Sequence, residues 1–227
     1  MVAYGDRLNM IVSRTLLGFS LAVAGLIFLL YGCSQANAIT RLPPPGATGG
    51  KSVMEALQLR RTTREFTTRE LPDQVLSDLV WAAFGINRPE SGERTAPTAW
   101  GEKGIDILVF TAEGVFRYAP EEHGLETLLE GDLRELAGTA DFVTAAPVTL
   151  VYLADHSRTP ETAVWEKEKY AYVHTGAIGQ NVYLYCASAG LGTVIHDSTP
   201  KGALAGKLGL RKDQQIILAQ TVGYPSP

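Results

Sequence analysis

The stretch Arg60-Arg61-Thr62-Thr63-Arg64-Glu65-Phe66 gathers three arginines within five positions and places threonine hydroxyls between them. Just before it, Ser52 is a typical N-cap, and residues 53–59 carry apolar side chains at helical spacing. The arginines therefore stand where a short amphipathic helix ends and the chain turns. Planar, permanently charged guanidinium groups beside hydroxyls suit a phosphate. The alternative is a solvated basic turn, balanced by Glu65 and Glu70, which is the commoner role of a charge run.

Composition narrows the class of protein. The 227 residues allow one domain or two small ones, and a hydrophobic content of 45% is ample for a core. The net charge of −4 and the absence of a long basic stripe argue against nucleic acid as a partner. The histidines are scattered without ligand spacing, so we expect no metal site, and His196 is expected to be structural. Cys186 lies among apolar residues and is expected to be a small buried hydrophobe.

The first 38 residues read as a targeting leader. Arg14 precedes an uncharged apolar run that is shorter than the roughly 20 residues of a spanning helix. Cleavage before Cys33, in a segment like a bacterial lipobox, would leave a lipidated N-terminus, whereas cleavage after Ala38 would follow a small-x-small site. An uncleaved anchor is a third possibility. The sequence predicts export, to the periplasm or as a lipoprotein, with membrane contact only through the leader or a lipid anchor. Residues 39–51 read as a Pro/Gly linker, and residues 52–227 as the domain.

The domain alternates between helical and strand patterns without internal repeats. We expect helices over residues 53–59, 72–84, 160–189 and 200–208, short helices within 125–146, a long loop from 87 to 104, and strands over 105–111, 115–118, 148–154, 193–196 and 215–222. This order predicts an α+β fold with a mostly antiparallel sheet. The second half of the long helix is apolar nearly all round, which indicates burial in the core or against a second subunit.

The motif Arg-Arg-Ser/Thr-x-Arg-x-Phe after a first short helix resembles the opening motif of the nitroreductase family of FMN-dependent oxidoreductases. Later stretches agree in order and spacing across residues 52–225: Arg94-Thr95-Ala96-Pro97-Thr98, Gly190-Leu191-Gly192 and Val222-Gly223-Tyr224-Pro225. The resemblance implies a nitroreductase-like fold, with a mostly antiparallel central sheet flanked by helices. It also implies an intertwined homodimer with the long helix central to its interface.

The resemblance carries a set of FMN-binding residues. Phosphate binding is expected from Arg60, Arg61, Thr62 and Arg64, with Lys201 or Lys207 as further candidates. The loop containing Pro97, Thr98 and Gly101 is expected to lie along the flavin, Val194 and Ile195 to contact one face of its ring, and the backbone near Asp197 and Ser198 to donate to flavin N5. Gly101 and Lys103 stand where the family has Asn and Gln, which leaves the flavin contact there to backbone groups.

By resemblance, the protein is an FMN-dependent oxidoreductase that transfers hydride through flavin N5 to or from a small organic substrate of the nitroaromatic, quinone or enone class. NAD(P)H is the donor that the family implies. No side-chain acid or base is evident, which suits a site whose reactive atom belongs to the flavin. Residues 114–118 and 130–134 resemble short, single-domain members related to the azoline-oxidising dehydrogenases of thiazole- and oxazole-modified peptide pathways.

Two alternatives stay open. The changes at Gly101 and Lys103 favour an exported flavin-binding protein with the same fold and little or no turnover. A flavin-free structural dimer is the other alternative, but it would leave the three clustered arginines without a role.

Overall fold

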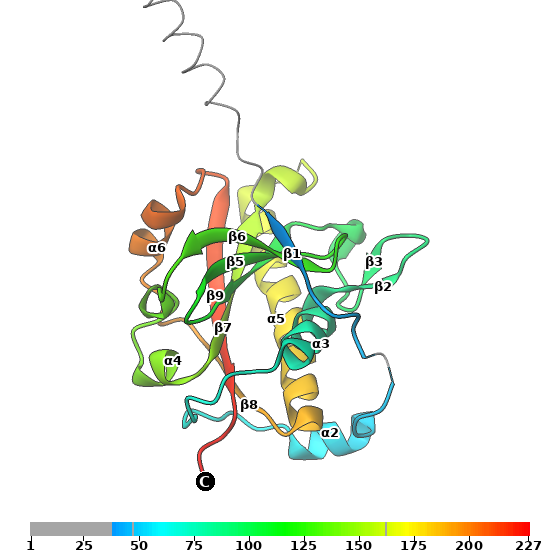
Figure 1. The fold of residues 1–227 in the computed structure, drawn as a ribbon. Coiled ribbons are helices and arrows are strands. Elements are labelled where there is room, and N and C mark those ends of the chain that lie inside the picture. Colours follow the sequence, from blue (N-terminus) through cyan, green and yellow to red (C-terminus); the bar gives the residue numbers. More distant parts are fainter. Residues whose placement is uncertain (1–37, 47, 162) are drawn as a thin grey trace, which may run out of the picture. The chain divides into compact units, whose positions relative to one another are not determined.

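Seven strands form one antiparallel sheet in the order β1-β6-β5-β4-β7-β9-β8 (Figure 1). The computed structural model describes residues 38–46, 48–161 and 163–227, so the expected leader lies outside the described residues except for Ala38. The strands are β1 (Ile39–Arg41), β4 (Ile105–Phe110), β5 (Gly114–Ala119), β6 (Gly124–Glu130), β7 (Val148–Asp155), β8 (Gly192–His196) and β9 (Gln214–Gly223). The mostly antiparallel α+β fold expected from the sequence is confirmed.

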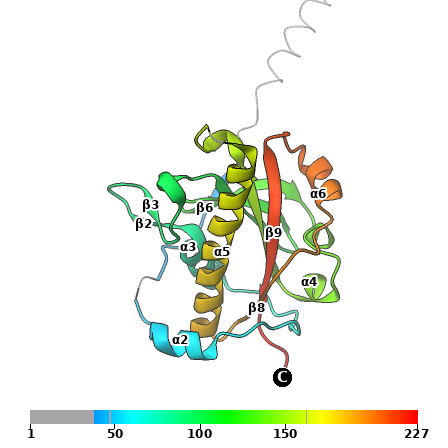
Figure 2. The same cartoon turned by 180° about the vertical axis from the view of Figure 1, so that it is seen from behind.

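Helices cover both faces of the sheet (Figures 1 and 2). One face packs against α3 (Asp73–Phe84) and α5 (Val164–Ala189), and the other against α4 (Asp141–Ala145) and α6 (Lys201–Leu208). Successive side chains of a strand point to opposite faces. In the central strand β7, Leu150 and Tyr152 therefore enter the first core, and Val151 and Leu153 enter the second. This double burial explains why β7 reads as a continuous apolar run.

The two helices that border the arginine stretch end as their sequences indicate. Ser52 and Glu55 form a reciprocal capping box at the start of α2 (Val53–Leu59). Gly190 adopts a left-handed conformation, with φ of 74°, and closes α5 after 26 residues. Cys186 near that end is buried and free, as expected, and burial raises the pKa of its thiol. Among the described residues, no helix is both long and apolar enough to cross a membrane.

The first part of residues 125–146, a segment expected to hold short helices, is instead the strand β6. Its residues pair with β5 on one side and with β1 on the other. Only the short 3-10 turn η2 (Arg134–Leu136) and α4 are helical in that segment. The long loop expected from residue 87 to 104 contains a small hairpin, β2 (Ile86–Arg88) with β3 (Glu93–Arg94), and the 3-10 turn η1 (Ala99–Gly101).

The start of the expected linker is part of the domain. Residues 39–41 form β1, and Leu42 continues the attachment by donating its amide to the carbonyl of His123. The carbonyl of Pro43 accepts from the hydroxyl of Ser77 at 2.6 Å, and that of Pro44 accepts from Gln74. The consecutive prolines have no amide hydrogens to donate, but their carbonyls still accept bonds from α3.

Candidate functional site

The arginine stretch lies beside β8, although more than a hundred residues separate the two in sequence. Thr62 forms a parallel bridge with Thr193, and the amide of Thr63 donates to the carbonyl of Thr193 at 3.0 Å. Gly192 permits this approach, because a Cβ there would lie 2.9 Å from side-chain carbons of Thr63. The structure therefore brings the first and third motifs of the sequence together.

Tyr183, on α5, joins the arginine stretch to β8. Its hydroxyl lies 3.1 Å from the hydroxyl of Thr62 and accepts the amide of Ile195, also at 3.1 Å. The guanidinium carbon of Arg60 lies 5.2 Å from the centre of the Tyr183 ring, which is within cation–π range. Tyr183 belongs to the half of the long helix expected to be apolar, and nothing in its sequence neighbourhood indicates the role of the hydroxyl.

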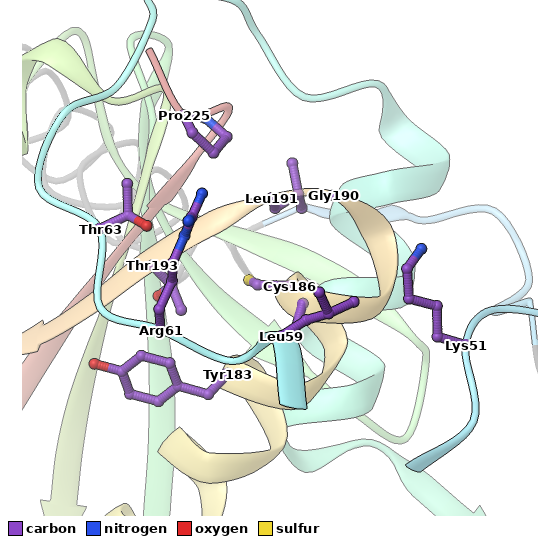
Figure 3. A pocket seen from close by; sticks show the side chains of 11 residues that line it. Lys51, Leu59, Arg61, Thr63, Tyr183, Cys186, Gly190, Leu191, Thr193 and Pro225 are labelled. Atoms are coloured by element: carbon purple, nitrogen blue, oxygen red, sulfur yellow. The ribbon is translucent and has the colours of Figure 1, made fainter. Parts of the chain in front are cut away.

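Side chains of the arginine stretch point to two sides of its backbone. Arg60 and Thr62 face Tyr183, and Arg64 is exposed. Arg61 and Thr63 point the other way, into a pocket of about 280 Å³ (Figure 3). Its lining is completed by Lys51, Leu59, Tyr183, Cys186, Ala187, Gly190, Leu191, Thr193 and Pro225. Arg61, expected among the phosphate ligands, is therefore separated from Arg60 by the backbone between them.

The charge of the stretch is not neutralised by its neighbours. None of Arg60, Arg61 and Arg64 forms an ion pair with a residue that the structure describes, and Glu65 and Glu70 form none either. A basic turn balanced by those two carboxylates is therefore not what the structure shows. Unpaired guanidinium groups beside a hydroxyl are a suitable receptor for an anion.

The two candidate lysines lie beyond β8. Lys201 is 2.6 Å from the carboxylate of Asp197 and donates to the carbonyl of Ile217, so it is engaged near the C-terminal end of β8. Lys207 is exposed on α6. Lys51, which lines the pocket beside Arg61, was overlooked because it falls in the segment read as a linker.

β8 is an edge strand, and its outer edge carries backbone groups towards the arginine stretch. The carbonyl of Thr193 accepts from Thr63, and the amide of Ile195 donates to Tyr183. Asp197, whose backbone was expected near flavin N5, directly follows β8 and is exposed. Val194 differs, because it is 1% exposed and packs with Phe66. Its side chain is therefore unavailable to a ligand, whereas Ile195 is half-buried.

Ser198 and His196 belong to a small polar chain behind β8. The Ser198 hydroxyl lies 2.9 Å from Nδ1 of His196, and Nε2 lies 3.0 Å from the hydroxyl of Thr221. Burial lowers the pKa of His196 to about 4, so its ring is neutral at pH 7. These contacts suit the structural role expected of His196. Among the described residues, no group of three or more His, Cys, Asp or Glu side chains could hold a metal ion.

The loop with Pro97, Thr98 and Gly101 lies elsewhere on the molecule. The amide of Ala99 donates to Nε2 of His174 at 2.8 Å, which fixes the loop to the first half of α5. His174 precedes Tyr183 by nine residues, or about 14 Å along the helix axis. The structure therefore does not bring this loop next to the arginine stretch within one chain.

These motifs occur together in a known group of proteins. The model of the nitroreductase family matches residues 57–224, which run from the last residues of α2 through the arginine stretch and β8 to the end of β9. The chain belongs to the nitroreductase family. A family protein of Methanocaldococcus jannaschii is 36% identical over 152 residues, which cover 62% of this chain and 75% of that protein. A family protein of Ralstonia eutropha JMP134, known from a crystal structure, is 40% identical with a TM-score of 0.78, and the match covers 86% of this chain and 92% of the other.

More distant nitroreductase-like structures share the fold alone. The Vibrio harveyi NADPH:FMN oxidoreductase, solved with NAD+, is 21% identical with a TM-score of 0.58, over 77% of this chain and 69% of that one. The Escherichia coli microcin synthetase McbBCD complex contains a chain that is 17% identical with a TM-score of 0.64. The match covers 85% of this chain and 80% of that one. This likeness is one of fold.

Proposed function

We propose that this nitroreductase-family protein is an FMN-dependent oxidoreductase that transfers hydride to or from a small organic substrate of the nitroaromatic, quinone or enone class. One observation carries the proposal. In a chain of this family, Arg60 and Thr62 converge on Tyr183 beside the outer edge of β8, and none of the three arginines of the stretch is neutralised by a described carboxylate.

The residues along this edge fit FMN. The guanidinium groups of Arg60 and Arg64 and the hydroxyl of Thr62 suit the phosphate, with Arg61 turned away from them. From Thr193 to Asp197 the strand advances about 13 Å, enough to separate an anionic end from a flat ring. Ile195 would offer apolar contact, and the backbone at Asp197 and Ser198 an N–H donor. When bound, the flavin supplies the hydride transfer through N5, and the protein holds and orients it.

The partner that we propose is a second copy of this chain. α5 exposes Trp165 by 64%, Tyr172 by 45% and Val173 by 57%, and the adjacent α2 exposes Val53 and Met54 by more than 60%. A surface this apolar is typical of an interface. Association over this face would let the loop of one subunit, with Pro97, Thr98 and Gly101, reach the arginine stretch of the other. The separation of about 14 Å along α5 within one chain favours that arrangement.

We also propose export of the mature domain, to the periplasm or as a lipoprotein, on the basis of the leader alone. NAD(P)H is the donor that the family suggests, but it is a cytosolic compound. An exported enzyme would therefore take electrons from another donor or oxidise its organic substrate. The resemblance to azoline-oxidising dehydrogenases favours oxidation of the organic substrate.

The phosphate assignment is tested by three single variants, Arg60→Ala, Arg64→Ala and Arg61→Ala. Loss of a hydrogen bond to a charged group costs about 1.5–3 kcal/mol, so the first two should weaken FMN binding roughly tenfold or more. Arg61→Ala is the matched control, because it removes the same charge from the other side of the backbone. Its FMN affinity, measured by titration of flavin fluorescence, should stay within about threefold of the parent, as for a small electrostatic change.

An equal or larger loss in Arg61→Ala would place the phosphate in the pocket and contradict the assignment. Turnover is tested separately on the FMN-bound protein. Reduction by NADPH or by an organic donor, followed by reoxidation with a quinone, would identify an enzyme. A flavin that only dithionite reduces, and that no quinone or nitroaromatic reoxidises, would identify the binding protein with little or no turnover.

A further inference from the structure

The loop between β3 and β4 contains a backbone conformation that its sequence disfavours. Trp100 has φ of 52° and ψ of 21°, in the left-handed region that bulky residues rarely adopt. Gly101 follows with φ of 69°, which glycine accepts readily. A non-glycine residue persists in this region only when the surrounding structure holds it there.

His174 supplies that restraint. Its side chain is almost completely buried, and its Nε2 accepts the amide hydrogen of Ala99, the residue before Trp100, at 2.8 Å. A ring nitrogen that accepts a hydrogen bond carries no proton, so the ring is neutral with its hydrogen on Nδ1. Nδ1 faces a carboxylate oxygen of Glu102 at 3.9 Å, and Glu102 is also buried.

The groups around His174 come from three elements. Tyr170 of α5 stacks on the imidazole at 5.9 Å, and Trp100 meets Tyr170 edge-on at 4.8 Å. Lys167 of α5 and His156 of η3 (His156–Arg158) line the same small cavity as His174 and Glu102. Burial lowers the pKa of His174 and raises that of Glu102. The neutral imidazole is therefore the form that this site favours at pH 7.

We propose that His174 is a positioning residue that holds the loop over residues 97–101 while its ring is neutral and releases it when the ring is protonated. Protonation turns Nε2 into a donor, which then opposes the N–H of Ala99 instead of accepting it. The imidazolium keeps a partner in Glu102 as long as that carboxylate is ionised. Trp100 loses its restraint at the same step and relaxes from the left-handed conformation.

The contacts of His174 determine whether the closed loop is favoured at high or at low pH. The hydrogen bond to Ala99 requires the neutral ring, so the closed loop is fully favoured above the ordinary histidine pKa of 6.5. Because the pKa of His174 in the closed loop is lowered, that preference is lost as the pH falls through a value below 6.5. The consequence for the cofactor rests on the proposed function. If this loop completes the partner's FMN site, acidification loosens the site without touching the arginines.

The loop is followed directly by ¹⁹F NMR of the full chain labelled with 5-fluorotryptophan. The chain has three tryptophans, and the signal absent from Trp100→Phe identifies that of Trp100. From about pH 8 to about pH 5, we expect this signal to shift or broaden along one titration with a midpoint below the ordinary histidine pKa. Stopping near pH 5 avoids His196, whose pKa is about 4.

Glutamine variants of His174, His156 and Glu102 assign the titration to a residue. In His174→Gln, the amide oxygen still accepts from Ala99 but does not titrate, so the Trp100 signal should stay at its closed position throughout. The matched control His156→Gln removes a histidine of the same neighbourhood, whose Nε2 lies 3.1 Å from Gln215, and should titrate like the parent. In Glu102→Gln, the imidazolium loses its partner, and the midpoint should fall.

A Trp100 signal that is constant from pH 8 to pH 5 would overturn the proposal, as would one that moves equally in the parent and in His174→Gln. An unchanged or raised midpoint in Glu102→Gln would overturn it too, and this variant keeps the test available if His174→Gln fails to fold. The measurement needs no flavin. A failure of the loop proposal is therefore distinct from a failure of the FMN proposal, which would show as lost binding at neutral pH with the loop titration intact.

Discussion

At the scale of the residue, the decisive fact is that neighbours in the arginine stretch serve different sides of the backbone. Arg60 meets the ring of Tyr183, and Arg61 points into the pocket with Lys51. The sequence identifies the cluster and its affinity for phosphate. The sequence does not show to which side of the backbone each arginine points. The orientation of an extended segment is set by its partner strand, and the pairing with Thr193 is a tertiary contact.

Tyr183 allows the link between this geometry and cofactor binding to be tested. In Tyr183→Phe the ring beneath Arg60 remains, but the hydroxyl that meets Thr62 and the amide of Ile195 is lost. A backbone amide left without its partner costs about 1–3 kcal/mol, so we expect lower stability in chemical denaturation. We also expect FMN binding to weaken several-fold, because the arginine stretch loses the tie to β8 that runs through Tyr183 and keeps only its backbone bridge to Thr193.

Tyr185→Phe is the control for this effect. It lies two residues further along α5, and its hydroxyl donates to the carbonyl of Val75 at 3.2 Å, away from the arginine stretch. This variant should lose comparable stability and keep its FMN affinity. Equal losses of affinity in the two variants would mean that Tyr183 acts only through general stability and does not position the arginine stretch for the cofactor.

At the scale of the element, the sequence predicted those segments whose local pattern agrees with their final environment. β7 is mostly apolar, apart from Thr149 and its last residue Asp155, and is buried on both faces, and α2 carries its own capping box. β6 was missed because its leucines and glutamates favour a helix locally, while pairing with β1 and β5 decides its structure. β1 was missed because consecutive prolines begin one residue after it and the segment was read as a linker.

The long helix shows a similar limit. Its apolar second half was expected in the core or against a partner, and most of that half packs within its own chain, including Ile178, Val182 and Cys186. The large exposed apolar residues of α5 lie in its first half. Hydrophobicity along the sequence does not distinguish these two situations, because both halves carry large apolar side chains.

The first half of α5 therefore carries the prediction about the dimer. Replacing Val173, which is 57% exposed, by Glu should leave the fold of one chain intact and place a charge in the proposed interface. We expect the parent protein to sediment as a dimer at micromolar concentration and Val173→Glu as a monomer with weakened FMN binding. Lys207→Glu, on exposed α6, is the control and should remain dimeric. A monomeric parent would contradict the interface.

At the scale of the whole molecule, the features expected in the FMN site fall into two groups. The arginine stretch and β8 meet at one end of α5, and the loop with Pro97, Thr98 and Gly101 meets the helix about 14 Å away. The sequence alone predicts the residues of both groups. Only the structure shows that they are separate in one chain, and a second copy of the chain is the proposed means of uniting them.

The central claim is that this arrangement binds FMN, and the visible spectrum of the purified protein tests it most directly. We would express the chain from Ile39, which retains β1, and record the spectrum before and after adding FMN and removing the excess. Flavin absorption bands that stay with the protein are the predicted result. A colourless, folded protein that also fails to retain added FMN would contradict the proposed function and leave only the fold and the family membership standing.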